Sequence, residues 1–194
     1  MKKLLGILVL GLFLITPSWA DDIRDFQIEG MSVGDSALDY FSETKINSLQ
    51  KNFYPKSKKF FYVLIGPEKK FIAYEKVKFT FKENDKNYKI YALSGVFDYP
   101  NSIKQCYKKR KEIISELDAM FHTAKKDNYT FKYPSDTSGK SKATVKDYFL
   151  EDGEIRIWCT DWSKNSNVKN YTDNLQVSIQ FKEYSYWIKN EAYK

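Results

Sequence analysis

The chain is short of the side chains on which metal binding and nucleophilic catalysis most often depend. Its 194 residues include one histidine, His122, and two cysteines, Cys106 and Cys159. A zinc site needs three or four ligands drawn mainly from cysteine and histidine, and these three residues stand far apart in the sequence. A Ser–His or Cys–His pair would have to use that same histidine. We therefore expect neither a metal site nor a nucleophilic enzyme.

Arginine is equally scarce. Basic residues outnumber acidic ones by 32 to 25, for a net charge of +7, but only three of the basic residues are arginine. Dedicated phosphate sites favour arginine because its planar head binds two oxygens at once. An excess of lysine together with many Asn, Ile, Tyr and Phe residues is typical of an AT-rich genome. We therefore expect no nucleic-acid partner.

A nucleotide-binding loop is not indicated either. Gly139-Lys140-Ser141 has the closing letters of a phosphate-binding loop, but Pro134 stands where that motif requires its first glycine. The segment also lacks the apolar strand that leads into the loop and the helix that follows it. We expect no cofactor.

Long hydrophobic runs are confined to the N-terminus. Lys2-Lys3 precedes an apolar run over residues 4–15, and Ser18 and Ala20 are small residues at the −3 and −1 positions of a secretory cleavage site. The run is too short to span a bilayer, which takes about 20 residues. We expect residues 1–20 to be a signal peptide, and the rest to be periplasmic or secreted without stable membrane insertion. Cleavage removes two lysines and no acid, which takes the net charge from +7 to +5.

The two cysteines are expected to form a disulfide. Apolar residues recur at steps of three and four over residues 102–123, which predicts the longest helix, with Asn101 as its N-cap. Cys106 lies on this apolar stripe, and Cys159 lies on the apolar side of a predicted strand. An even pair of cysteines in an oxidising compartment indicates a bridge, here one that stabilises the fold by roughly 4 kcal/mol. Two buried free thiols are the alternative.

Alternation of apolar and polar residues predicts an antiparallel sheet with one wet face. Val77, Phe79 and Phe81 point one way, and lysines point the other. Asp152-Gly153 predicts a hairpin turn. Strands are expected over residues 60–66, 75–82, 88–99, 144–150, 154–162 and 174–184, and short helical segments over 33–41 and 43–51.

Two tryptophans are the candidate recognition surface. Trp158 and Trp162 lie on the side of their strand opposite Cys159. Exposed aromatic rings combine a large apolar area with polar edges, which suits them to stacking on a sugar or holding a protein. The alternative is that a helix or the C-terminal tail covers this face.

Carboxylates supply the rival hypothesis. Asp98 and Asp161 each stand in a run that otherwise indicates a strand, and two carboxylates flanking a cleft suffice for glycoside hydrolysis. Arg110 interrupts the apolar stripe of the long helix, where it is either an anion anchor or a side chain with its stem on the core edge. His122 lies near the C-terminal end of that helix, where the helix dipole favours a cation.

One segment carries a family resemblance. Ile28-Glu-Gly-Met-Ser-Val-Gly-Asp-Ser-Ala-Leu38 resembles the Gly-Met-Ser/Thr-x-x-x-Val opening of the BamE/SmpA envelope-assembly family. Gly34 and Tyr40-Phe41 depart from that family's later Leu-Gly-x-Pro, and the lipobox cysteine of the family is missing. The whole chain resembles uncharacterised small secreted proteins of AT-rich marine bacteria, a resemblance that implies no activity.

Together these patterns predict one α+β domain over residues 21–194, with an antiparallel sheet packed on the long helix. Its possible halves, 21–99 and 100–194, are similar in element order to the beta-lactamase inhibitor protein and to BamE-like domains, whose sheets bind proteins. We expect a non-enzymatic module that binds another envelope component, a protein in the first instance. The alternative is a periplasmic hydrolase that acts on glycans.

Overall fold

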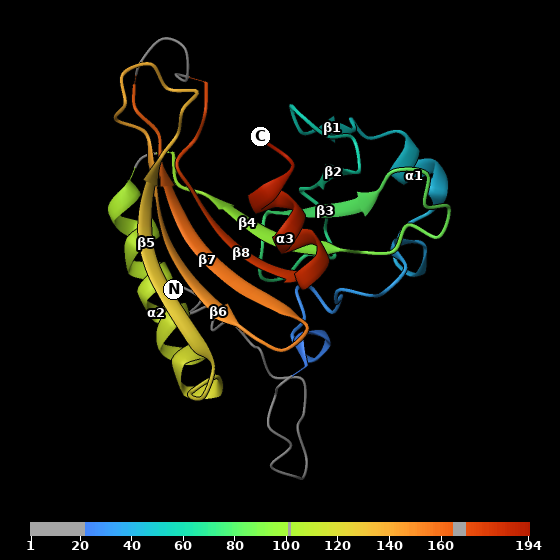
Figure 1. Ribbon diagram of the computed structural model, residues 1–194, viewed down its shortest axis with the longest axis horizontal. Coiled ribbons are helices and arrows are strands. Elements are labelled where there is room, and N and C mark those ends of the chain that lie inside the picture. Colours follow the sequence, from blue (N-terminus) through green and yellow to red (C-terminus); the bar gives the residue numbers. More distant parts are fainter. Residues whose placement is uncertain (1–21, 101, 165–169) are drawn as a thin grey trace.

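The computed structural model describes residues 22–100, 102–164 and 170–194, and within them it shows an α+β fold built on one antiparallel sheet of eight strands (Figure 1). The strands are β1 (Asn52–Phe53), β2 (Phe60–Ile65), β3 (Lys76–Lys82), β4 (Ala92–Asp98), β5 (Lys125–Lys132), β6 (Lys142–Phe149), β7 (Gly153–Asp161) and β8 (Asn174–Phe181). The helices are α1 (Glu43–Asn47), α2 (Ile103–Met120) and α3 (Lys182–Asn190), with short 3-10 turns at Ile23–Asp25 and Ala37–Asp39.

The strand order is β1-β2-β3-β4-β8-β7-β6-β5, so each half of the chain contributes four consecutive strands. Helix α2 carries the chain from β4, in the middle of the sheet, to the far edge at β5. The second half then returns strand by strand, until β8 pairs with β4 from Ala92↔Gln180 to Asp98↔Asn174. The two halves therefore share one continuous sheet.

Helix α2 packs against β7 and β8 on one face of this sheet, and the N-terminal segment from Ile23 to Ile46 adds its buried residues to the same hydrophobic core. Cys106 on α2 and Cys159 on β7 are both fully buried and form a disulfide with a Cα–Cα distance of 6.0 Å. Ile113 and Leu117 continue the same buried side of the helix. The apolar side of α2 and the apolar side of β7 are thus joined by a covalent bond.

Helix α3 covers part of the opposite face with a second, smaller core. Trp187 is completely buried there and lies against Phe60 and Tyr54, with ring centroids 4.9 and 5.0 Å away. The Tyr54 and Tyr184 hydroxyls are hydrogen-bonded to each other within this cluster. The helix follows β8 directly, so the last strand and its cover are one continuous segment.

A close approach fixes the β6–β7 hairpin at the predicted Asp152-Gly153 turn. A Cβ atom at Gly153 would lie 2.3 Å from the Gln180 carbonyl oxygen on β8. Only glycine fits at that distance. Glycine is therefore required at this position by packing.

One expected helix is absent, and some elements were not expected. The 33–41 segment is not a helix, because only the 3-10 turn at Ala37–Asp39 forms there and Leu38 is exposed. The backbone N–H of Ser32 donates to the Asp35 carboxylate at 2.9 Å, as in a helix cap, but no helix follows. Strand β5 and helix α3 have no counterpart in the prediction. The proposed N-cap, Asn101, lies outside the described residues.

In the described ranges no helix is long and apolar enough to cross a membrane.

We expect replacement of both cysteines, Cys106→Ala with Cys159→Ala, to lower the free energy of unfolding by about 4 kcal/mol, because the bridge restricts the unfolded chain over a loop of roughly 50 residues. Urea unfolding followed by tryptophan fluorescence measures the loss. A reducing agent should shift the wild-type midpoint and leave the variant unchanged. Wild-type protein that unfolds at the same urea concentration with and without reductant would show that no bridge forms.

Candidate functional site

The face of the sheet turned away from α2 carries the candidate site, and we call it the open face. Strand register places five polar side chains in one row across it: Lys78 pairs with Ser94, Ser94 with Ser178, Ser178 with Arg156, and Arg156 with Asp147. Directly paired residues of antiparallel strands share a face, so this polar row runs over β3, β4, β8, β7 and β6.

Two small residues form the middle of the polar row. The Ser94 and Ser178 hydroxyls are hydrogen-bonded to each other at 3.0 Å, and both side chains are buried. Lys78 reaches past Ser94 to Gln176 on β8, whereas the guanidinium of Arg156 is turned the other way, to Asp147 on β6. The row is thus a serine pair flanked by two cations.

Lys78 lies across the face between aromatic rings. Its Nζ atom is 5.6 Å from the ring centroid of Tyr62 and 5.7 Å from that of Trp158, and it donates to Oε1 of Gln176 at 3.2 Å. Burial, with a smaller contribution from the positive charge of Arg156, lowers the pKa of Lys78 to about 8. This ammonium group has therefore lost much of its water without gaining a carboxylate.

The other charged side chains that β3, β4, β7 and β8 place on the open face are paired, as far as the described residues show. Lys76 pairs with Asp98, and Lys82 pairs with Glu183 on α3 at 2.9 Å. Glu154 pairs with Lys189 at 2.7 Å. Lys78 is the exception.

Arg156 is held in place by two buried acids. Its Nε and Nη2 donate to the two oxygens of Asp147 at 2.8 and 2.9 Å, and Nη2 lies 3.1 Å from Oε1 of Glu154. The pairing with Asp147 raises the pKa of Arg156, so its charge is permanent. A bidentate pair fixes the guanidinium plane, and the Nη1 group is free of hydrogen bonds to the described residues.

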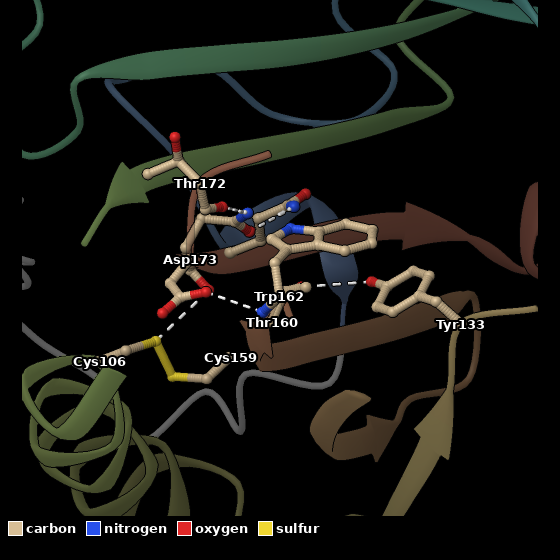
Figure 2. Close-up of a disulfide and its surroundings, with 9 residues drawn as sticks. Cys106, Tyr133, Cys159, Thr160, Trp162, Thr172 and Asp173 are labelled. Atoms are coloured by element: carbon tan, nitrogen blue, oxygen red, sulfur yellow. Dashed lines mark hydrogen bonds between the residues drawn. A yellow bond between two sulfur atoms is a disulfide. The ribbon is translucent and has the colours of Figure 1, made fainter. Parts of the chain in front are cut away.

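An aromatic cluster lies at the end of the open face, beyond the last residue of β7. The Trp162 ring is stacked on Tyr133 at 4.4 Å and lies 4.6 Å from Tyr171, whose side chain is 53% exposed. Two hydrogen bonds hold this cluster to the sheet (Figure 2). The backbone N–H of Trp162 donates to the Asp173 carboxylate at 2.7 Å, and the hydroxyls of Tyr133 and Thr160 are 3.2 Å apart. We call these three rings the aromatic cluster.

The C-terminus lies close to the same rings. Tyr193 is 61% exposed and lies edge-on to Tyr54 at 5.7 Å. Burial and the phenols of Tyr62 and Tyr133 raise the pKa of Tyr193. Tail, strand and cluster therefore border one stretch of the open face.

Both predicted recognition residues lie at this site. Trp158 points away from the disulfide and is half-buried beside Lys78, and Trp162 is the centre of the aromatic cluster. The alternative, a covering helix, holds for the other end of the face, where α3 lies over Phe60 and Ala92. The structure thus divides the face between α3 and the side chains around Trp158.

The two predicted carboxylates do not come together. Asp98 pairs in register with Asn174 and so lies on the open face, in an ion pair with Lys76. Asp161 follows Thr160 on β7 and lies on the opposite face, 3.7 Å from the Nζ atom of Lys142. Carboxylates on opposite faces of a sheet cannot flank one sugar.

One serine stands within the letters of a nucleophile motif. Residues 30–34, Gly-Met-Ser-Val-Gly, do spell Gly-x-Ser-x-Gly, so the letters of a nucleophile motif are present. The motif works only where a strand turns sharply into a helix and exposes the serine. Here Ser32 is buried, and its hydroxyl donates to the carbonyl of Phe26 at 2.9 Å. Ser32 is a structural residue.

The remaining sequence candidates are also accounted for locally. Ser141 of the Gly139-Lys140-Ser141 segment is buried and donates to Asp136 at 2.7 Å, so it anchors a loop. Arg110 lies half-buried near Tyr107 and Tyr148, and burial lowers its pKa. His122 is exposed just after α2. Within the described part of the chain, no group of three His, Cys, Asp or Glu residues is arranged to hold a metal ion.

No protein-family model, curated protein or solved structure matches this chain.

We expect Lys78→Met to raise the free energy of unfolding at neutral pH, by about 1–3 kcal/mol, because the variant no longer buries a charge. Folded wild-type protein releases the Lys78 proton near pH 8, whereas an unfolded lysine holds it to about 10.5. The unfolded state thus binds more protons in this window, and wild-type stability rises with pH there. The difference in free energy of unfolding between Lys78→Met and wild type should therefore become smaller as the pH rises through this window.

Urea unfolding of both proteins at about pH 7 and about pH 10 tests this expectation. Lys76→Met is the matched control: it removes a neighbouring lysine of the same face that is paired with Asp98, so it should give no gain at neutral pH. A Lys78→Met protein less stable than wild type at both pH values would contradict the unpaired state of Lys78.

Proposed function

We propose that this chain is an exported protein that binds another component of the cell envelope, a protein, through the open face. The observation that carries the proposal is the arrangement of Trp158 and the aromatic cluster beside Lys78. Large rings that remain partly exposed next to an unpaired cation are typical of recognition surfaces.

The export part of the proposal is supported by the disulfide. Residues 1–20, the expected signal peptide, lie outside the described residues. The bridge between Cys106 and Cys159 is a feature of proteins that fold in oxidising compartments. An exported location also fits the expected partners, which are other proteins of the envelope.

A binding role is favoured over the hydrolase because of what faces outward. Asp147 of the polar row and the neighbouring Glu154 are buried and paired with Arg156. A glycosidase needs one carboxylic acid and one carboxylate on either side of a sugar. The groups left available on this face are aromatic rings, amides and an ammonium, which bind rather than hydrolyse.

Trp158→Ala with Trp162→Ala should abolish retention of the partner from a periplasmic extract while the fold persists. A tryptophan at the centre of an interface contributes about 2 kcal/mol or more, so affinity should fall at least about 30-fold. The measurement is pull-down with the mature protein as bait, compared with circular dichroism and thermal unfolding of the same samples.

The matched control is Tyr186→Ala, which removes an exposed aromatic side chain from α3, away from the aromatic cluster. It should retain the wild-type partner. A folded double-tryptophan variant that retains every wild-type partner would remove the open face from consideration.

A further inference from the structure

We propose that a hollow between α3 and the end of the β6–β7 hairpin binds an aliphatic chain that ends in a carboxylate, such as a fatty acid, and that Lys125 and Lys182 receive the carboxylate. This inference goes beyond the proposed function, because the hollow lies at the opposite end of β7 from Trp162 and the aromatic cluster.

The hollow has a volume of about 400 Å³, within the range of about 300–1,000 Å³ that small-molecule sites commonly have. It lies where α3 begins, beside the end of the β6–β7 hairpin (Figure 1). The backbone N–H of Lys182, the first residue of α3, donates to the Asp152 carbonyl at 2.9 Å. The helix and the hairpin that border the hollow are therefore joined to each other.

The floor of the hollow comes from the sheet and is apolar at its centre. Lys125 on β5 pairs in register with Phe149 on β6, and Phe149 pairs with Glu154 on β7, so all three share the open face. Leu150 lines the hollow next to Phe149. The Lys189 ammonium already lies over the Phe149 ring, 5.3 Å from its centroid. An aliphatic chain fits this floor better than an aromatic ligand, because the ring has little free area for stacking.

Two lysines border this apolar floor without an acid partner. Lys125 comes from the sheet and Lys182 from the helix, and both line the hollow. Among the described residues, no carboxylate lies within ion-pair distance of either ammonium group. The third lysine of the hollow, Lys189, is paired with Glu154 at 2.7 Å. The hollow therefore carries two uncompensated positive charges on opposite walls, and such a setting attracts an anion.

Glu154 is the one acid among the described residues that line the hollow, and its charge is already compensated. Its Oε2 atom accepts from Lys189, and its Oε1 atom lies 3.1 Å from Nη2 of Arg156 and accepts from the Gln180 amide. Both oxygens are thus occupied by groups of the protein. Glu154 therefore neither pairs with Lys125 or Lys182 nor excludes an anion between them.

A buried hydroxyl adds a hydrogen-bond donor to the two cations. Ser185 lines the hollow and is only 6% exposed. Its oxygen accepts from Nε2 of Gln180 at 2.9 Å, and its own proton has no acceptor among the described residues. A carboxylate has lone pairs enough to accept from two ammonium groups and a hydroxyl at once. The lining contains no arginine, whose planar head favours phosphate, so we assign the anionic end to a carboxylate.

Isothermal titration calorimetry with octanoate tests the site, with 1-octanol as the uncharged match and 2-naphthoate as an aromatic carboxylate. Octanoate should bind with a dissociation constant of about 0.1–1 mM, and the other two probes should bind at least about fivefold more weakly. In NMR spectra of the labelled protein, octanoate should shift the amide signals of Leu150, Gly153 and Ser185. The amide signal of Trp162 should stay in place.

Lys125→Met with Lys182→Met should weaken octanoate binding at least about tenfold and leave 1-octanol binding unchanged, because the variant loses charge and keeps apolar stems. The matched control is Lys132→Met with Lys140→Met, which removes two exposed lysines at the other end of β5 and should bind octanoate like wild type. Circular dichroism verifies that both variants are folded. Ser185→Ala supplies a second measurement and should weaken octanoate binding about threefold.

Three results would overturn the site. The first is equal affinity for octanoate and 1-octanol, or no octanoate binding up to about 10 mM. The second is equal affinity for octanoate and 2-naphthoate, which would remove the assignment to an aliphatic chain. The third is a set of shifted amide signals that leaves out Leu150, Gly153 and Ser185.

Vesicles of phosphatidylglycerol distinguish a single bound chain from a membrane surface. The protein should remain in the supernatant when these vesicles are sedimented, because the hollow takes one chain. Sedimentation with the vesicles that the Lys125→Met with Lys182→Met variant loses would overturn the assignment to a single chain. Retention of the protein partner is measured on the tryptophan variants, so each proposal can fail without the other.

Discussion

Strand β8 pairs with β4 on one side and with β7 on the other, and every feature of the open face depends on these two pairings. Each half of the chain makes four strands in order, but neither half alone brings Lys78 and Arg156 to the same row. The joint from Ala92↔Gln180 to Asp98↔Asn174 sets the register between the halves. A slip of one residue would turn Ser178 and Gln176 into the hydrophobic core.

The two faces of the sheet are stabilised by different interactions. Under α2 the core is apolar and is closed by a disulfide, so its stability comes from burial and from restriction of the unfolded chain. The open face instead buries charge, with Asp147, Glu154 and Arg156 satisfying one another. Such networks add little net stability, but they fix the orientation of every group in them. A rigid polar surface is what a recognition site requires.

The sequence predicts the parts of the fold in which one side of an element is apolar. Strands β2, β3 and β8 and helix α2 were expected near their observed bounds because their residues alternate or recur at helical spacing. Strand β5 was missed because it is an edge strand, exposed along most of its length, so its sequence, Lys125–Lys132, shows no apolar side. Helix α3 has only nine residues and no side-chain cap, so no local signal marks its start.

The candidate site was predicted only in part, for a related reason. Trp158 and Trp162 stand out by residue type, and the alternation around Cys159 gives their side of the strand. Lys78 was counted among lysines that face water, because a sequence shows which face a residue takes but not what lies over that face. Its desolvation by Trp158 and Gln176 depends on the β4–β8 pairing, which joins segments about 80 residues apart. Residues 30–34 are the opposite case: the sequence contains the letters Gly-x-Ser-x-Gly, but the structure lacks the sharp strand-to-helix turn that the motif requires.

The position of β8 has a consequence for how the protein is made. This strand lies in the middle of the sheet, yet residues 174–181 are the last of its eight strands to be synthesised, with α3 directly behind them. Until they arrive, β4 and β7 each present an unpaired edge, and such edges pair readily with other chains. If the chain is exported unfolded, as proposed above, both edges and their missing neighbour reach the envelope together. A chain cut short before residue 174 would keep both edges open and would be prone to aggregate.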